Sequence, residues 1–339
     1  MNDTSGLPAA GTVAPPSWSA TAPGKAILFG EHAVVYGRPA IAVPVTRLQA
    51  TASIVAAEAG SGVWLATPDL PGPAGSESGQ PYPMRQAPDD DPLRVAVYLA
   101  LASFWVLPEP AAGREPDIRV TVTSSIPVAR GLGSGAAVAT AVVRAIACFC
   151  GKDPPTDQVS RLVFEVDRLH HGTPSGIDNA VIAFEQPIYF VRGVEITRLA
   201  VGRPFELVIA DTGVASSTRR VVGYVRQRWQ ESPQRHEQLF DRIGEIARRA
   251  RSAIQRGDVG TTGRLMDENH EQLKNLGVSS PELDRLVGAA QAAGALGAKL
   301  SGAGWGGNMV ALVEPDTAGR VAGALRESGA TQVIVTEVS

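Results

Sequence analysis

The sequence is poor in cysteine, in aromatic residues and in excess charge of either sign. Only two of its 339 residues are cysteines, and aromatic residues make up 5%. Cys148 and Cys150 share one apolar stretch, a setting typical of buried small residues, so a disulfide framework and a cysteine metal site are excluded. The 31 basic and 34 acidic side chains give a net charge of −3, which offers no electrostatic footprint for a nucleic-acid partner.

Long hydrophobic runs are also missing. The longest run, from Val95 to Leu107, is shorter than the roughly 20 residues that span a bilayer, so we expect no membrane association. Residues 1–17 have neither the basic start nor the apolar core of a secretory signal. These absences exclude the membrane-spanning and secreted classes and predict a cytoplasmic protein.

The remaining composition is typical of a globular protein with sizeable cores. Hydrophobic residues make up 44% and charged residues 19%, and the length suggests two domains of ordinary size. Glycine and proline are abundant, with 36 and 25 residues, which predicts many turns. The composition changes near residues 193–204, so we predict one domain over residues 1–198 and a second over residues 199–339.

Hydrophobic periodicity predicts strands and helices that alternate irregularly along the chain. Strands are expected at residues 18–22, 25–29, 40–45, 119–125, 205–210, 298–301, 308–313 and 332–338. Helices are expected at residues 93–106, 136–149, 156–170, 218–229, 235–256, 259–275, 281–293 and 317–328. Residues 1–18 are expected to form a loose tail, and residues 68–92 a long irregular surface excursion. Because the order lacks the strict β-α-β rhythm of a doubly wound sheet, the predicted fold class is α+β.

A glycine-rich segment from Pro127 to Ala137 (PVARGLGSGAA) lies between a predicted strand and a predicted apolar helix. Glycines there let the backbone approach an anion, and the helix N-terminus offers free N–H groups and the positive end of its dipole. Phosphate binding is the functional interpretation of this segment. A tight strand-to-helix turn is the structural alternative.

A second glycine-rich segment runs from Lys299 to Asn308 (KLSGAGWGGN) and contains G-x-G-x-x-G, the dinucleotide-binding pattern. That pattern must open a helix, whereas the residues that follow, Met309 to Val313, are predicted to form a strand. A dinucleotide site is therefore not supported. The sequence of an ordinary P-loop is absent as well.

Lys25 stands inside an apolar strand-like segment, APGKAILF. A lysine in such a position is rarely buried without a partner, so we expect a carboxylate beside it. Asp178, in the polar segment HGTPSGIDN at residues 171–179, is the candidate. The two residues would form a catalytic pair in one interpretation and a structural ion pair in the other.

Four segments in order, APGKAILFGEHAVVYG, PVARGLGSGAA, HGTPSGIDNAV and KLSGAGWGGN, together resemble the GHMP kinase superfamily. The first and third are most similar to its mevalonate kinase branch. The resemblance covers residues 22–338 and implies a two-domain fold, with a mixed sheet in the N-terminal domain and a ferredoxin-like C-terminal domain. The implied activity is ATP- and Mg²⁺-dependent phosphorylation of the primary hydroxyl of mevalonate, and a homodimer is expected by resemblance alone.

The resemblance also implies roles for individual residues. Asp178 would be the catalytic base, and Lys25 would lower the pKa of the substrate hydroxyl and steady charge on the transferring phosphoryl group. Ser134 and Asp167 would hold Mg²⁺. The residues expected to contact the substrate are Glu31, His32, Ser175 and Thr218. Those expected to contact ATP are Pro127, Arg130, Gly131, Leu132, Gly133, Ser134, Gly135, Ala136 and Ala137.

Several positions depart from the usual pattern of the superfamily. Gly135 replaces a second serine that helps to hold Mg²⁺, and Asp167 replaces a glutamate. Phe29 stands where relatives often have histidine, Trp305 replaces a small residue, and Ser216 stands where some relatives carry a basic residue. The alternatives are therefore a phosphomevalonate kinase, a decarboxylase acting on a tertiary hydroxyl, a sugar kinase, or a non-catalytic ligand sensor.

Overall fold

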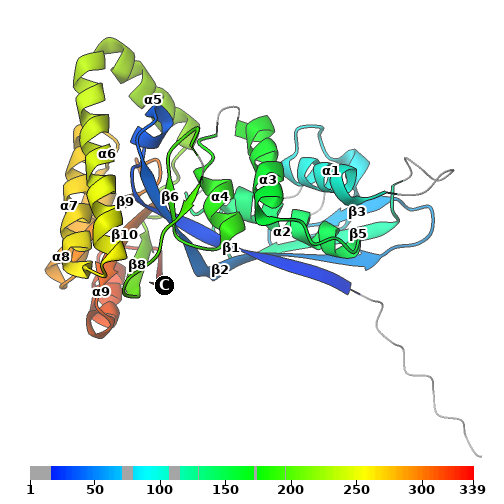
Figure 1. The fold of residues 1–339 in the computed structure, drawn as a ribbon. Coiled ribbons are helices and arrows are strands. Elements are labelled where there is room, and N and C mark those ends of the chain that lie inside the picture. The colour runs from blue at the N-terminus through cyan, green and yellow to red at the C-terminus, as the bar shows by residue number, and fades with distance from the viewer. Residues whose placement is uncertain (1–16, 71–78, 107–114, 129, 172–173, 195) are drawn as a thin grey trace, which may run out of the picture.

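The computed structural model describes residues 17–70, 79–106, 115–128, 130–171, 174–194 and 196–339, and it has an α+β architecture (Figure 1). The predicted tail falls on residues 1–16, which lie outside the described residues. Part of the predicted surface excursion, residues 71–78, lies outside them too. The rest of that excursion contains strand β4 (Tyr82–Pro83) and the 3₁₀ helix η2 (Met84–Gln86), so it is not wholly irregular.

The N-terminal half contains a seven-stranded sheet. Besides β4, its strands are β1 (Ser17–Phe29), β2 (Ala40–Ala56), β3 (Val63–Ala66), β5 (Ile118–Ser124), β6 (Ile188–Phe190) and β7 (Thr197–Arg198). Strand β2 pairs antiparallel with β1, β5 and β6, whereas β3 and β5 are parallel, so the sheet is mixed as predicted.

Helices cover this sheet, and α2 lies directly against β1 and β2. They are α1 (Pro92–Phe104), α2 (Ser134–Phe149), α3 (Thr156–His171) and α4 (Ile177–Phe184). Helix α1 begins where the sequence predicts, because the Asp91 side chain accepts the Arg94 N–H at 2.8 Å and Pro92 occupies the first turn. Helix α4 was not among the helices predicted from the sequence, so the prediction was wrong over these residues.

The C-terminal half contains a four-stranded antiparallel sheet of order β11-β8-β10-β9. Its strands are β8 (Phe205–Asp211), β9 (Gly297–Ser301), β10 (Asn308–Val313) and β11 (Gln332–Val338). Its helices are α5 (Thr218–Glu231), α6 (Pro233–Gln255), α7 (Val259–Asn275), α8 (Pro281–Ala292) and α9 (Pro315–Glu327). Along the chain, β8 is followed by helices α5–α8, and then by β9, β10, α9 and β11. This order of elements, together with the strand order of the sheet, is ferredoxin-like, as predicted.

Both faces of the C-terminal sheet are buried, which joins the two halves of the molecule. Along β8, Leu207 and Ile209 belong to the core shared with the N-terminal half, whereas Val208 and Ala210 belong to the core beneath helices α5–α9. Continuous apolar runs of this kind fit strands that are covered on both sides. The shared core therefore holds the two halves in a fixed arrangement on which a site can be built.

Among the described residues, no helix combines the length and the apolar character needed to cross a bilayer. The predicted domain boundary at residues 198 and 199 falls between β7, the last strand of the first sheet, and β8, the first strand of the second.

Candidate active site

Lys25 and Asp178 meet at the centre of the candidate site. Lys25 lies in β1 and is 3% exposed, and its Nζ is 3.1 Å from Oδ1 of Asp178, which is in the first turn of α4. The Asp178 side chain is 37% exposed, so its carboxylate is within reach of a ligand. A buried ammonium beside an accessible carboxylate at a helix N-terminus can both stabilise negative charge and accept a proton.

The glycine-rich segment before α2 packs directly against this lysine. The Lys25 backbone N–H donates to the Leu132 carbonyl at 3.0 Å. Gly133 has φ 75°, and a Cβ there would lie 2.8 Å from Cγ of Lys25 and 2.9 Å from Cδ1 of Ile182. Only glycine fits this position, because it supplies the left-handed backbone and leaves the space that the lysine side chain fills.

The start of α2 has the features of an anion site. Gly133 is the N-cap and has no side chain to accept the first N–H groups, so those of Ser134, Gly135 and Ala136 have no side-chain cap. A Cβ at Gly135 would meet no atom within 4 Å, so the backbone faces open space at that point. The predicted contact of Ala137 does not fit, because its N–H donates to the Gly133 carbonyl at 2.9 Å and its side chain is buried.

Other members of the predicted nucleotide set have different surroundings. Leu132 and Ala136 are buried, so only their backbone groups can face a ligand, whereas Pro127 is partly exposed. The Arg130 guanidinium lies against Asp211, with Nε 3.3 Å from Oδ2 and Nη1 3.4 Å from Oδ1. Arg130 is therefore held by a residue of the C-terminal half.

The second glycine-rich segment supports the first. Asn308 donates from Nδ2 to the Arg130 carbonyl at 2.5 Å. A Cβ at Gly307 would lie 3.4 Å from that same oxygen, and a Cβ at Gly302 would lie 3.9 Å from Cα of Gly131. The two loops approach closely because glycine removes the side chains that would separate them.

Asp167, on α3, lies near the central pair. Its pKa is raised to about 7 because the carboxyl is buried and Asp178 adds negative charge, with Lys25 opposing the shift. It makes no hydrogen bond or ion pair with the described residues. The two carboxylates repel one another, and a divalent cation such as Mg²⁺ would relieve that repulsion.

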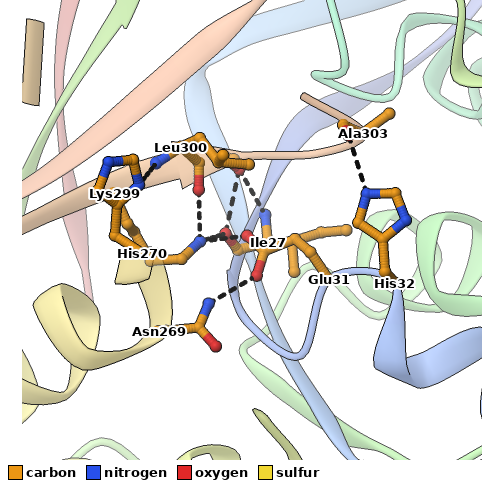
Figure 2. A network of polar contacts seen from close by, with 9 residues as sticks. Ile27, Glu31, His32, Asn269, His270, Lys299, Leu300 and Ala303 are labelled. Carbon is orange, nitrogen blue, oxygen red and sulfur yellow. Dashed lines mark hydrogen bonds and ion pairs between the residues drawn. The ribbon is translucent and has the colours of Figure 1, made fainter. Parts of the chain in front are cut away.

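Glu31 and His32 follow β1 and contact the C-terminal half (Figure 2). Glu31 is 1% exposed, and its carboxylate pairs with Lys299 of β9 and accepts from Asn269 of α7 at 3.0 Å. Both carboxylate oxygens of Glu31, a residue expected to contact the substrate, are therefore engaged by donors from the C-terminal half. His32 is buried and its Nε2 is 2.8 Å from the Ala303 carbonyl.

Burial lowers the pKa of His32, so the imidazole is neutral near pH 7. The Ala303 carbonyl can only accept a hydrogen bond, so Nε2 carries the ring proton and Nδ1 has a lone pair. Nδ1 makes no hydrogen bond with a described residue, and it can therefore accept one from a ligand.

Ser175 and Thr218 lie at the starts of two different helices, α4 and α5. Ser175 accepts the Ile177 N–H at 3.4 Å and so sits at the start of α4, one turn before Asp178. Thr218 is the exposed first residue of α5, and the neighbouring Ser216 donates to the Gly304 carbonyl. A hollow of about 850 Å³ is lined by Ser175 and Asn179, but by neither Lys25 nor Asp178.

Four residues that build this region were not among the predicted site residues: Asp211, Asn269, Lys299 and Asn308. Lys299 carried a usable signal, because it lies in the apolar run GAKLS and needs a partner for the same reason as Lys25. The other three gave no such signal, since their partners lie 81 to 238 residues away in the sequence.

Comparisons with known proteins show which family the chain resembles. Residues 95–186 match the sequence profile of the GHMP kinases N terminal domain, and residues 250–331 match that of the GHMP kinases C terminal domain. A mevalonate kinase from Pyrococcus furiosus is 35% identical, with 94% of this chain and 96% of the relative covered.

The chain belongs to the GHMP kinase family. Another mevalonate kinase relative of this GHMP kinase, from Aeropyrum pernix, is 32% identical over 86% of this chain and 87% of its own. The crystal structure of L. major mevalonate kinase in complex with R-mevalonate superposes with a TM-score of 0.81 and 27% identity, covering 97% of this chain and 98% of that one.

Proposed function

We propose that this GHMP kinase transfers the γ-phosphoryl group of ATP to the primary hydroxyl of mevalonate. The observation that carries the proposal is the Lys25–Asp178 pair, 3.1 Å apart beside an uncapped helix N-terminus. The mevalonate kinase relatives, up to 35% identical over nearly the whole chain, support the choice of substrate.

The reaction follows from the charges of this pair. The substrate hydroxyl is held next to Asp178, and the carboxylate accepts its proton as the oxygen attacks the γ-phosphorus. Lys25 stabilises the negative charge that develops on the oxygen and on the transferring group. The remaining requirement for phosphoryl transfer is positioning of the two reactants.

The nucleotide would be held by the first turn of α2. Its N–H groups and the positive end of the helix dipole stabilise phosphate oxygens, and the glycines at 131, 133 and 135 let those oxygens approach the backbone. Ser134 and Asp167 are the residues that would hold Mg²⁺. When bound, that ion would neutralise phosphate charge.

The acceptor would lie between β1 and the second glycine-rich segment. Neutral His32 accepts a hydrogen bond at Nδ1 from a substrate hydroxyl, while its Nε2 proton stays on the Ala303 carbonyl. Ser175 and Thr218 complete the proposed contacts, because the starts of α4 and α5 flank the site. The Glu31 carboxylate is occupied by Lys299 and Asn269.

Two arginines near the first and third motifs bear on whether the acceptor carries a phosphate of its own. A phosphorylated acceptor needs free cations near the first and third motifs. Arg38 is engaged by Glu237 and Asp241, with contacts of 2.5 and 2.8 Å, and Arg168 is engaged by Glu165 at 2.7 Å. These two arginines are already paired, and the choice of free mevalonate over phosphomevalonate or diphosphomevalonate is supported by the mevalonate kinase relatives.

The proposal includes a cytoplasmic location, where ATP is plentiful and thiols such as Cys148 and Cys150 stay free, and a homodimer expected from the resemblance. The test of function is ADP release with a panel of mevalonate, phosphomevalonate, diphosphomevalonate and sugars. We expect turnover with mevalonate, a 5-phosphorylated product by NMR and no CO₂. Inertness toward mevalonate with turnover of a phosphorylated acceptor contradicts the proposal.

A further inference from the structure

Lys299 is a buried cation that the proposed chemistry does not use. It lies in β9 and is 0% exposed, while its neighbours Ala298 and Leu300 pack into the core of the C-terminal half. Side chains alternate along a strand, so Lys299 points the other way, toward β1 of the N-terminal half (Figure 2). A charge is not buried in this way unless it is paired and hydrogen-bonded.

Every ammonium hydrogen of Lys299 has an acceptor. Nζ contacts the Glu31 carboxylate at Oε1, the Leu300 carbonyl at 2.5 Å and the Ile27 carbonyl at 3.5 Å. The second carboxylate oxygen of Glu31 accepts from Asn269. Both oxygens of a carboxylate from the N-terminal half are therefore held by donors from the C-terminal half.

The segment fixed by this pair leads directly into the proposed site. Glu31 is followed by His32, a non-glycine residue with φ 61°, whose Nε2 is held by Ala303. Ser301, on the same face of β9 as Lys299, exchanges hydrogen bonds with the N–H and carbonyl of Ile27 at 3.2 and 3.0 Å. A left-handed residue of this kind persists only where its surroundings fix it.

We propose that Lys299, assisted by Asn269, is a positioning residue that holds the Glu31–His32 turn in the geometry that binds the acceptor. The assignment of the acceptor rests on the function proposed above, whereas the positioning of the turn does not. Because its carboxylate is fully paired, Glu31 acts through the backbone that it anchors, and His32 presents Nδ1 to the ligand. Residues of the C-terminal half thus hold in place the turn that contacts the acceptor.

The test compares three variants of the full chain. Lys299→Met keeps the straight side chain and removes its charge, and Asn269→Ala removes only the hydrogen bond to the second Glu31 oxygen. His270→Asn is the matched control, because His270 neighbours Asn269 and accepts the Leu300 N–H at 3.3 Å but does not touch Glu31. Asparagine can keep that acceptor.

Two measurements are made on each variant. Amide hydrogen exchange over residues 27–36 should quicken by about tenfold in Lys299→Met and by a smaller factor in Asn269→Ala, with no change in His270→Asn. The KM for mevalonate should rise by about tenfold in Lys299→Met while the KM for ATP stays within about twofold, since the nucleotide loop is untouched. If Lys299→Met does not fold, the hydrogen exchange and the KM values of Asn269→Ala decide whether the positioning role holds.

The outcomes separate this inference from the proposed function. Unchanged exchange over residues 27–36 in Asn269→Ala and Lys299→Met overturns the positioning role, whatever the substrate is. An equal loss of kcat at unchanged KM in all three variants also overturns it, because that pattern reports general damage. If the wild type does not phosphorylate mevalonate, the proposed function fails, and hydrogen exchange still decides the role of Lys299.

Discussion

Replacing Gly133 with alanine tests the central geometry of the site most directly. The residue has φ 75°, a conformation that costs a residue with a side chain about 1–2 kcal/mol. The new methyl group would also lie 2.8 Å from Lys25 and 2.9 Å from Ile182, where overpacking costs about 1–3 kcal/mol. We expect Gly133→Ala to lower the free energy of unfolding by about 2–5 kcal/mol, the sum of these two costs.

The same substitution should damage catalysis more than binding. Lys25 fills the space that the methyl group would take, so its ammonium must move relative to Asp178. A displacement of about 1 Å at a reacting group costs about 10²-fold in rate. We therefore expect kcat to fall by about two orders of magnitude in those molecules that still fold, while the KM for mevalonate changes little.

Gly135→Ala is the control for stability in the same loop. A methyl group there meets no atom within 4 Å and the backbone is not left-handed, so stability should rise by about 0.4–1 kcal/mol. Urea unfolding and steady-state ADP release measure both variants. If Gly133→Ala keeps wild-type stability and kcat, the packing of Lys25 against the loop is not what fixes the central pair.

Three further outcomes follow from the site. Asp178→Asn should lower kcat by about 10²–10⁴ with ATP affinity retained, and a variant keeping a tenth of its activity would show that another group is the base. Asp167→Asn should raise the Mg²⁺ concentration needed for half-maximal rate, and an unchanged requirement would move the metal role elsewhere. Burial lowers the pKa of His270 below 6.5, so folding opposes its protonation. Stability is therefore present above pH 6.5 and lost as the pH falls through the lowered pKa, and His270→Asn should flatten that part of the stability–pH curve.

Much of the secondary structure could be predicted because it is local. Helix α1 has a capping aspartate and a proline in its first turn, and α8 has Ser280 and Pro281 in the same places. Helix α4 could not be predicted in this way. It is only eight residues long, and its N-cap is Gly176, which has a φ of 90° and no side chain that a capping pattern would reveal.

For other contacts, the sequence could show that a buried residue needs a partner but not which residue supplies it. The sequence indicated that Lys25 requires a carboxylate, and the structure supplies Asp178 at 3.1 Å. The same reasoning applied to Lys299 would have asked for a partner without identifying Glu31, which is 268 residues away. Burial creates the need for a partner, but only the packing of β9 against β1 determines which residue meets it.

The family and the α+β class could be predicted from the amino-acid sequence, because motifs, periodicity and caps are local properties of the chain. The burial of Glu31 beside Lys299 and the contact between Arg130 and Asp211 became visible only in the folded structure. The tertiary structure also decided that both faces of the C-terminal sheet are covered. The physical reason is that burial and pairing depend on which surfaces meet, and residues hundreds of positions apart in the chain make those surfaces.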